Sequence, residues 1–176
     1  MPIVVSEPDR SWAAAFGAER ERIAAALGDA AAGIEHIGST AVPGLPAKPI
    51  IDIVVALHDM AAAPDCIPAL EGIGYQRAPG GDFEGRLFLR RIGTDGGATH
   101  HLSLTPLGGG YWVDHLAFRD ALRANPDLCR RYGDLKRRAA AQHEDVEDYT
   151  RAKTELVRDA LLAAGHTPRS GWAAES

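Results

Sequence analysis

The chemistry-bearing residues of this chain begin with an aspartate inside an apolar segment. Asp52 lies in the run PIIDIVV, residues 49–55, where burial would separate its carboxylate from water. A buried carboxylate needs a cation, hydrogen-bond donors or a strand end that opens into a cleft. Because strand side chains alternate, Asp52 shares a face with Ile50 and Val54. A polymerase-type Mg²⁺ site often uses acids at positions i and i+2, and here the second position is Val54. The sequence therefore predicts one of two roles for Asp52. Its side chain is either the single carboxylate of a cleft, or it accepts hydrogen bonds from the N–H groups of a turn or from one arginine.

A turn that could bind an anion precedes this segment. Gly38, Ser39 and Thr40 stand at the end of the short strand predicted over residues 34–38. A chain that turns after a strand leaves backbone N–H groups free, and two hydroxyls add donors, so the turn could hold a phosphate or a carboxylate. The structural alternative is a tight turn whose hydroxyls cap the next element.

Two adjacent histidines lie in a second apolar segment, HHLSL, residues 100–104. The two-residue period of a strand puts His101 and Ser103 on one face and His100 on the other, so a regular strand cannot offer both histidines to one metal. One histidine can still meet Asp52 across the sheet, as a base or a metal ligand. The alternative is a hydrogen-bonded histidine with a packing role.

Basic residues flank these segments and could form a ring of cations around an anionic ligand. Arginine forks match the geometry of phosphate and carboxylate groups, although any one of these charges alone reads as a solvated surface group. The candidates are Lys48, Arg86, Arg119, Arg123, Lys136 and Lys153. Tyr149 is four residues before Lys153 and shares its predicted helix face.

Strands in the middle of the chain and helices at both ends must position these groups. Apolar periodicity and glycine-rich turns separate the elements, and the turns between consecutive strands require some antiparallel pairing. The predicted strands are 34–38, 49–57, 74–77, 86–92 and 98–105, and the predicted helices are 11–27, 61–72 and three between 113 and 165, broken at 125–126 and 143–145. This order indicates an α/β (α+β) fold with a mixed sheet covered by helices. We expect one domain over residues 1–165 and a flexible tail over 166–176.

Composition limits the function class. The chain has 176 residues, of which 45% are hydrophobic and 24% charged, as in an ordinary globular domain. No apolar run approaches the roughly 20 residues that span a bilayer, and the first residues lack an export pattern, so we expect a cytoplasmic protein without membrane contact. A net charge of −5 disfavours broad nucleic-acid binding. Cys66 and Cys129 lack metal-type spacing and are expected to be reduced.

Four segments, in this order, resemble the GrpB (UPF0157) family. They are HIGSTAVPGLPAKPIIDIVV, THHLSLTP, HLAFRDALRANPDLCRRYGDLK and DYTRAK. The resemblance extends from about residue 7 to residue 165, and the family also occurs fused behind dephospho-CoA kinase in some bacteria. It implies a nucleotidyltransferase-like fold in which Gly38-Ser39 is the phosphate-binding turn and Asp52 is the first acid of the following strand.

The family frame matches further positions, and two positions depart from it. The matches are Lys48, His101, Arg119, Asp120, Arg123, Tyr132, Lys136, Tyr149 and Lys153. Active members of the superfamily usually carry a second acid where this chain has Val54, so the resemblance does not extend to a two-metal site. The family's His-His-Leu-His run ends here in Ser103, which removes one ligand or base.

These observations lead to a principal hypothesis and two alternatives. In the first, the protein binds a phosphorylated small molecule, such as a nucleotide, and transfers a nucleotidyl or related group. Ser39 and the adjacent N–H groups would hold a terminal phosphate, Asp52 would anchor one Mg²⁺, and His101 would be a base or ligand. The alternatives are a non-catalytic module that kept the cleft and an enzyme for an amino-acid-like carboxylate substrate. The sequence leaves the ligand, the acceptor and the oligomeric state open.

Overall fold

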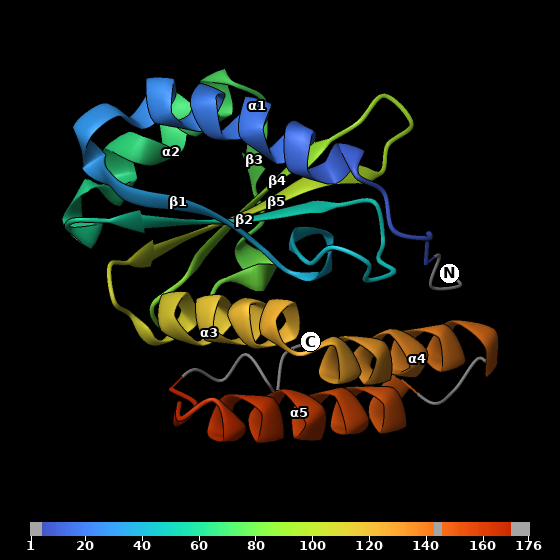
Figure 1. Cartoon of the computed structure of the whole chain (residues 1–176). Helices are drawn as coiled ribbons and strands as arrows, with labels where there is room; N and C mark the ends of the chain where they lie inside the picture. The colour runs from blue at the N-terminus through green and yellow to red at the C-terminus, as the bar shows by residue number, and fades with distance from the viewer. Residues whose placement is uncertain (1–4, 143–145, 170–176) are drawn as a thin grey trace.

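A five-stranded mixed sheet lies between two layers of helices in the computed structural model, which describes residues 5–142 and 146–169 (Figure 1). The side chains of residues 140–150 fall outside the described part. The helices are α1 (Ser11–Leu27), α2 (Ala63–Gly72), α3 (Gly110–Ala124), α4 (Pro126–Gln142) and α5 (Val146–Ala163). The strands are β1 (Ala31–Ile37), β2 (Ile51–Leu57), β3 (Tyr75–Arg77), β4 (Leu87–Ile92) and β5 (Ala98–Pro106).

The strand order β1-β2-β5-β4-β3 brings together segments that are far apart in the chain. β1 pairs antiparallel with β2, β4 pairs antiparallel with β3 and β5, and β2 and β5 run parallel. Parallel neighbours need a long crossover, and the segment from α2 to β4 supplies it. The predicted mixed sheet, flanked by helices, is therefore confirmed.

The element boundaries agree with the predicted pattern except near prolines and glycines. The predicted helix over 11–27 has the bounds of α1. β2 begins at Ile51 and not at residue 49, because the N–H of Ile50 closes a turn on the carbonyl of Lys48 at 2.7 Å. α3 begins at Gly110, three residues before the start expected at residue 113. Glycines 108–110 favour a loop in the sequence, but the last of them is the first residue of the helix. The helices break at Asn125 as expected, whereas the predicted break at 143–145 lies outside the described residues.

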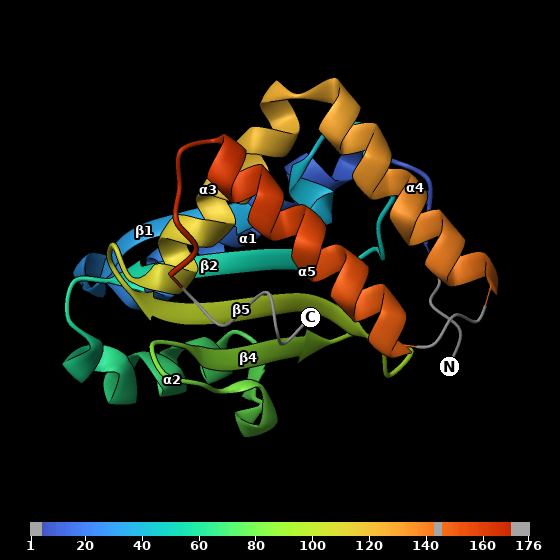
Figure 2. The same ribbon diagram turned by 90° about the horizontal axis from the view of Figure 1, so that it is seen from below.

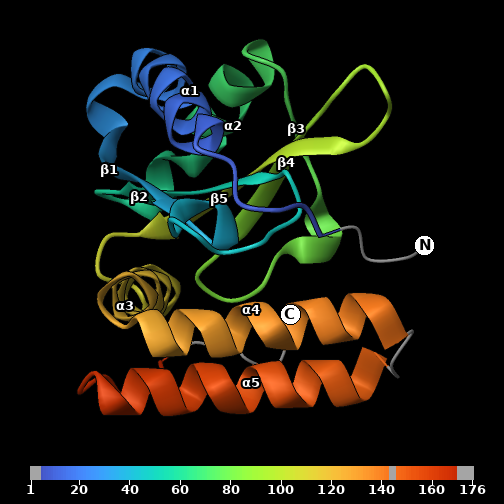
Figure 3. The ribbon, with the colours of Figure 1, turned by 45° about the vertical axis from the view of Figure 1, so that its right-hand side comes forward.

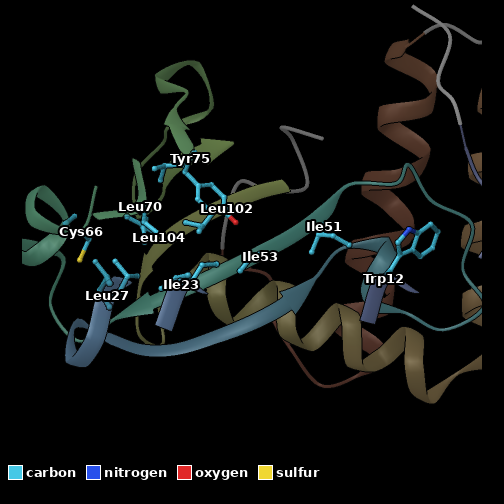
Figure 4. Packing of buried hydrophobic residues seen from close by; sticks show 14 of the residues in the cluster. Trp12, Ile23, Leu27, Ile51, Ile53, Cys66, Leu70, Tyr75, Leu102 and Leu104 are labelled. Atoms are coloured by element: carbon cyan, nitrogen blue, oxygen red, sulfur yellow. The ribbon is translucent and has the colours of Figure 1, made fainter. Parts of the chain in front are cut away.

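The sheet face that carries Ile51 and Ile53 packs against α1 and α2 (Figure 4). Trp12, Ile23 and Leu27 from α1 contact this face together with side chains of α2 and of the central strands. The odd-numbered residues of β2 therefore point away from Asp52, as their alternation predicts. Val54, on the Asp52 face, is also fully buried, so β2 is covered on both faces as a central strand should be.

The opposite face of the sheet is covered by α3, α4 and α5, which lie beside one another (Figures 2 and 3). Their shared core contains Val42, Leu45, Phe118, Leu122, Tyr132, Leu135, Val157, Ala160 and Leu161. A smaller cluster of Ile37, Val54 and Tyr111 joins α3 to the sheet. This layer therefore faces Asp52 and the turn that follows β1.

The carboxyl-terminal segment returns to α3 as far as it is described. The backbone N–H of Arg169 donates to Asp114 Oδ2 at 2.8 Å, and Gly110 approaches the Arg169 carbonyl so closely that a Cβ would lie 2.9 Å from its oxygen. Residues 170–176 of the expected tail lie outside the described residues. Among the described helices, none has the length and apolar character that crossing a membrane requires.

Candidate functional site

A cleft of about 460 Å³ opens between the Asp52 face of the sheet and the helices on that side. It collects groups from the β1–β2 connection, from β2 and β5, and from α3 and α5. The predicted site residues that line it are Gly38, Ser39, Lys48, Asp52, Arg86, His101, Ser103, Arg119 and Lys153. The fold therefore assembles most of the predicted site in one place.

Asp52 and His101 meet across the parallel pair β2 and β5. They are register partners, and His101 Nδ1 lies 3.0 Å from Asp52 Oδ1. Their side chains are 35% and 34% exposed, so both reach the solvent of the cleft. Because a carboxylate accepts, Nδ1 carries the hydrogen, and in the neutral form of the ring Nε2 is then the acceptor. The pair has the geometry of a histidine base oriented by a carboxylate.

Gly38 lets the turn after β1 approach the carboxylate of Asp52. Its φ of +71° is in the region that favours glycine, and a Cβ there would overlap the Asp52 side chain. The short 3-10 turn Ser39–Ala41 follows. The N–H groups of Ser39 and Thr40 begin this turn, so the turn itself provides them with no acceptor. Backbone donors and the Ser39 hydroxyl thus lie at the edge of the cleft.

The Thr40 hydroxyl does not face the cleft. Thr40 is buried, its Oγ1 donates to the Ile50 carbonyl at 3.2 Å, and it is 2.9 Å from His36 Nε2. Arg123 also lies behind the turn, where Nε and an NH₂ group donate to the Ala41 carbonyl at 3.0 and 2.7 Å. Both residues support the turn from its far side.

The three lysines of the chain gather at this site. Lys48 and Lys153 line the cleft, and Lys136 Nζ contacts the Ser39 hydroxyl. Burial lowers the pKa of Lys136 to about 7, and the charge of Lys153 adds to the effect. Burial likewise lowers the pKa of Lys153 to about 8, while the negative charge of Asp52 acts in the opposite direction on both lysines. The cleft is therefore cationic although the chain is acidic overall.

Arg86 reaches the cleft through an aromatic enclosure. Its guanidinium carbon lies 4.3 Å from the ring centre of Phe88, 5.0 Å from that of Tyr111 and 5.2 Å from that of Phe83. Nε donates to Ser103 Oγ at 2.9 Å, and an NH₂ group donates to the Gly81 carbonyl at 2.8 Å. Ser103 therefore fixes Arg86, a role that the sequence did not predict.

Arg119 lines the cleft with its charge already balanced. Its guanidinium donates to Glu35 at 2.7 Å, to Asp120 at 2.8 Å and to the His36 carbonyl at 3.1 Å. This arrangement joins α3 to β1 and leaves Arg119 less able than Lys48 or Lys153 to neutralise a ligand.

His100 lies on the face of the sheet opposite to the cleft. His100 is buried near Glu19 and Arg91, and its Nδ1 is 2.9 Å from Thr99 Oγ1. Burial lowers its pKa to about 4. The predicted role of His100 as a lining residue is therefore not supported by its position. The Tyr149 side chain lies outside the described residues.

Tyr111 and His115 are cleft residues that the sequence did not predict, whereas Tyr132, which the family resemblance matched, also lines the cleft. Tyr111 and His115 both line it, their rings stack with centres 3.7 Å apart, and His115 Nδ1 is 2.8 Å from the Tyr111 carbonyl. Burial lowers the pKa of His115 to about 3, so this ring is neutral at ordinary pH. The four-residue spacing of Tyr111 and His115 is a helical signal that could have paired them.

The residues present do not by themselves fit a resident Mg²⁺ site. Within the described ranges, no group of three or more histidine, cysteine, aspartate or glutamate side chains comes together. Mg²⁺ favours oxygen ligands, and Asp52 is the one carboxylate among the described residues that line the cleft. The predicted anchoring of Mg²⁺ by Asp52 and His101 would need further oxygens from outside the protein.

Comparison with known proteins assigns the family. The family model described as GrpB protein matches residues 2–162. The chain belongs to the GrpB family. A UPF0157 protein of Pseudomonas aeruginosa is 40% identical over 94% of this chain and 70% of its own length. The crystal structure of conserved protein GrpB from Enterococcus faecalis has a TM-score of 0.79 and 31% identity, over 93% of this chain and 100% of that one.

Other similarities are partial or distant. The UPF0157 protein YqkA of Bacillus subtilis is 33% identical over 86% of this chain, which spans only 44% of that protein. Cid1 in complex with the UTP analog UMPNPP has a TM-score of 0.40 and 13% identity, which is too low to bear on the function of this GrpB chain.

Proposed function

We propose that the cleft of this GrpB protein binds a nucleotide or another phosphorylated small molecule. The observation that carries the proposal is the convergence of all three lysines at a cleft that is lined by one carboxylate within the described part of the chain. Lys48 and Lys153 have no hydrogen-bond or ion-pair partner among the described residues. A bound anion would supply the counter-charge that these lysines lack.

The Asp52–His101 pair supports a finer proposal, transfer of a nucleotidyl group to an acceptor hydroxyl. His101 Nε2 would take the hydroxyl proton, the acceptor oxygen would bond to the α-phosphorus, and pyrophosphate would leave. Lys48 and Lys153 would stabilise the charge on the phosphates. The residues of the chain give no complete Mg²⁺ site, so any such ion would be bound jointly with ligand oxygens. We further propose the cytoplasm as the compartment, in keeping with the two free cysteines.

A non-catalytic binding module is the second candidate. It is favoured by one observation, the fully buried Val54 at the position where a second acid would serve metal-dependent transfer. In this case Asp52 and His101 would hydrogen-bond to the ligand without proton transfer.

Thermal shift with nucleoside triphosphates, in the presence and absence of Mg²⁺, tests the proposal. We expect the melting temperature to rise with ligand concentration, and Lys153→Met to abolish the rise. Arg130→Met removes an exposed cation of α4 and is the matched control that should retain the rise. Transfer is supported if the melting temperature rises only with Mg²⁺, if Asp52→Asn removes this rise, and if pyrophosphate is released. The binding module is supported if the melting temperature rises without Mg²⁺ and no turnover occurs. No response to any phosphorylated compound would refute both.

A further inference from the structure

Lys136 of α4 contacts the hydroxyl of Ser39, a residue of the turn after β1. The Lys136 side chain is buried. Its Nζ also lies 3.3 Å from the Pro46 carbonyl oxygen and 4.7 Å from the Tyr132 ring centre. Ser39 lines the cleft, whereas Lys136 is not among the lining residues. A ligand in the cleft would thus meet Ser39 before it met Lys136.

The environment of Lys136 favours its neutral form. Among the described residues it has no carboxylate partner, and a buried ammonium without one is costly. Lys153 of α5 and Lys48 disfavour its positive charge, whereas Asp52 of β2 and Cys129 of α4 favour it. Burial outweighs the favourable charges and brings the pKa to about 7. A large fraction of Lys136 is therefore a free amine at neutral pH, with its nitrogen at the Ser39 oxygen.

We propose that Ser39 is a nucleophile activated by Lys136 as general base, and that the cleft catalyses acyl transfer or hydrolysis of an ester or thioester of an anionic small molecule. The Ser39 proton passes to Lys136 Nζ while Oγ bonds to the carbonyl carbon. The leaving group departs with the proton from the Lys136 ammonium, and water then releases the acyl group from Ser39. The activity goes beyond the proposed nucleotide binding and does not depend on it.

The surroundings of Ser39 fit the other requirements of this chemistry. The N–H groups of Ser39 and Thr40, at the start of the 3-10 turn, could bind the negative charge that develops on the carbonyl oxygen. Lys48 and Lys153 line the same cleft and would attract an anionic substrate. Arg123 fixes the turn through the Ala41 carbonyl, which keeps Ser39 in place.

An alkyl fluorophosphonate tests this pair directly in the full-length protein. Ser39 Oγ bonds to phosphorus, fluoride leaves, and Lys136 takes the hydroxyl proton. We expect one adduct in the intact mass, mapped by peptide analysis to Ser39 and absent from Ser39→Ala. Ser11→Ala removes an exposed hydroxyl and should be labelled like the wild type. Failure to label Ser39 in the folded wild-type protein overturns the proposal, whatever the outcome of the nucleotide binding test.

Two measurements separate a base from a structural support. Lys136→Arg keeps a positive charge but cannot give up its proton, so we expect it to label at least tenfold more slowly than the wild type. In the wild type, the labelling rate should rise about tenfold from pH 6 to pH 8 as Lys136 loses its proton. The pH series keeps the proposal testable even if the variant does not fold. Equal labelling of a folded Lys136→Arg, or a rate independent of pH across this range, contradicts the role of Lys136.

Discussion

At the scale of single residues, lysine is rare in this chain and is found only at the candidate site. Of its 19 basic residues other than histidine, three are lysines, and all of them lie at the cleft or directly behind it. The remaining sixteen are arginines, whose guanidinium stays protonated in proteins. Lysine changes its pKa readily on burial, and burial lowers the pKa of Lys136 and of Lys153.

The first prediction is that two lysines titrate far below the usual range. With ¹³C-labelled lysine the folded protein should give three side-chain signals, one for each lysine. We expect the Lys136 and Lys153 signals to titrate near pH 7 and pH 8, because burial disfavours their charged forms. Assignment comes from single Lys→Met variants.

Asp52→Asn and unfolding serve as controls for this titration. Removal of the carboxylate takes away a charge that favours protonation, so both midpoints should fall further. Unfolding in guanidinium should return them to about 10.4. Midpoints above 10 in the folded protein would show that these lysines are solvated and would remove the basis for Lys136 as a base.

The strand period and the family resemblance together predicted the central pair of the site. Alternation predicted that only one of the two adjacent histidines could meet Asp52, the family resemblance pointed to His101, and the register pairs Asp52 with His101. It could not predict that Thr40 would bond to Ile50 or that Ser103 would hold Arg86. Those contacts depend on where loops fold back, which has no periodic signal in the sequence.

At the scale of elements, α1 is joined to the sheet by a buried charge. Glu19 is 4% exposed; it accepts from Arg91 of β4 at 2.6 Å, from Arg22 at 2.8 Å and from the Tyr75 hydroxyl of β3 at 3.0 Å. Glu19 is three residues after Phe16 and four before Ile23, so helical spacing places its carboxylate on the apolar face of α1. Helical periodicity identifies a face, but the partners that bury Glu19 come from strands more than 50 residues away.

The second prediction concerns this junction. Glu19→Gln removes the negative charge that balances Arg91. The Arg91 side chain, which is 26% exposed, then has no carboxylate at this position. We expect a loss of about 2 kcal/mol in the free energy of unfolding, because a part-buried group loses its partner but keeps some water. Urea unfolding followed by circular dichroism measures it.

Glu21→Gln is the matched control, since it makes the same chemical change on the exposed side of α1. It should alter the free energy of unfolding by less than about 0.5 kcal/mol. Equal effects of the two variants would mean that the contacts of Glu19 contribute nothing beyond a surface charge.

At the scale of the whole molecule, the layered architecture could be predicted and the depth of the cleft could not. Strand and helix order indicated a mixed sheet covered by helices, which the structure confirms. The cleft exists because α3 to α5 cover one face of the sheet while the turn after β1 keeps Asp52 open to solvent. This shape depends on packing between distant segments, such as Tyr111 against Val54, which local patterns do not encode.

The layers also bury three histidines in neutral form, which makes the fold sensitive to acid. His36 stacks on Phe16, His100 lies near Glu19, and His115 stacks on Tyr111. Burial lowers the pKa of His36 and His100 to about 4 and that of His115 to about 3, from 6.5 in the unfolded chain. Between pH 6.5 and 4 the unfolded chain therefore binds protons that the folded protein does not. The stability should fall as the pH falls through this window.

The third prediction is that the free energy of unfolding in urea decreases steadily from pH 6.5 to pH 4.5. Each buried histidine should contribute a slope on the order of 1 kcal/mol per pH unit, because each adds one proton to the difference between the two states. His100→Gln removes one such group and should reduce the slope, whereas His58→Gln, at an exposed position, should leave it unchanged. Measurement above pH 4.5 limits the contribution of carboxyl groups, most of which titrate lower. A stability that is flat across this range would mean that the three rings take up protons in the folded state, and hence that the layers on both faces of the sheet open more readily than their burial implies.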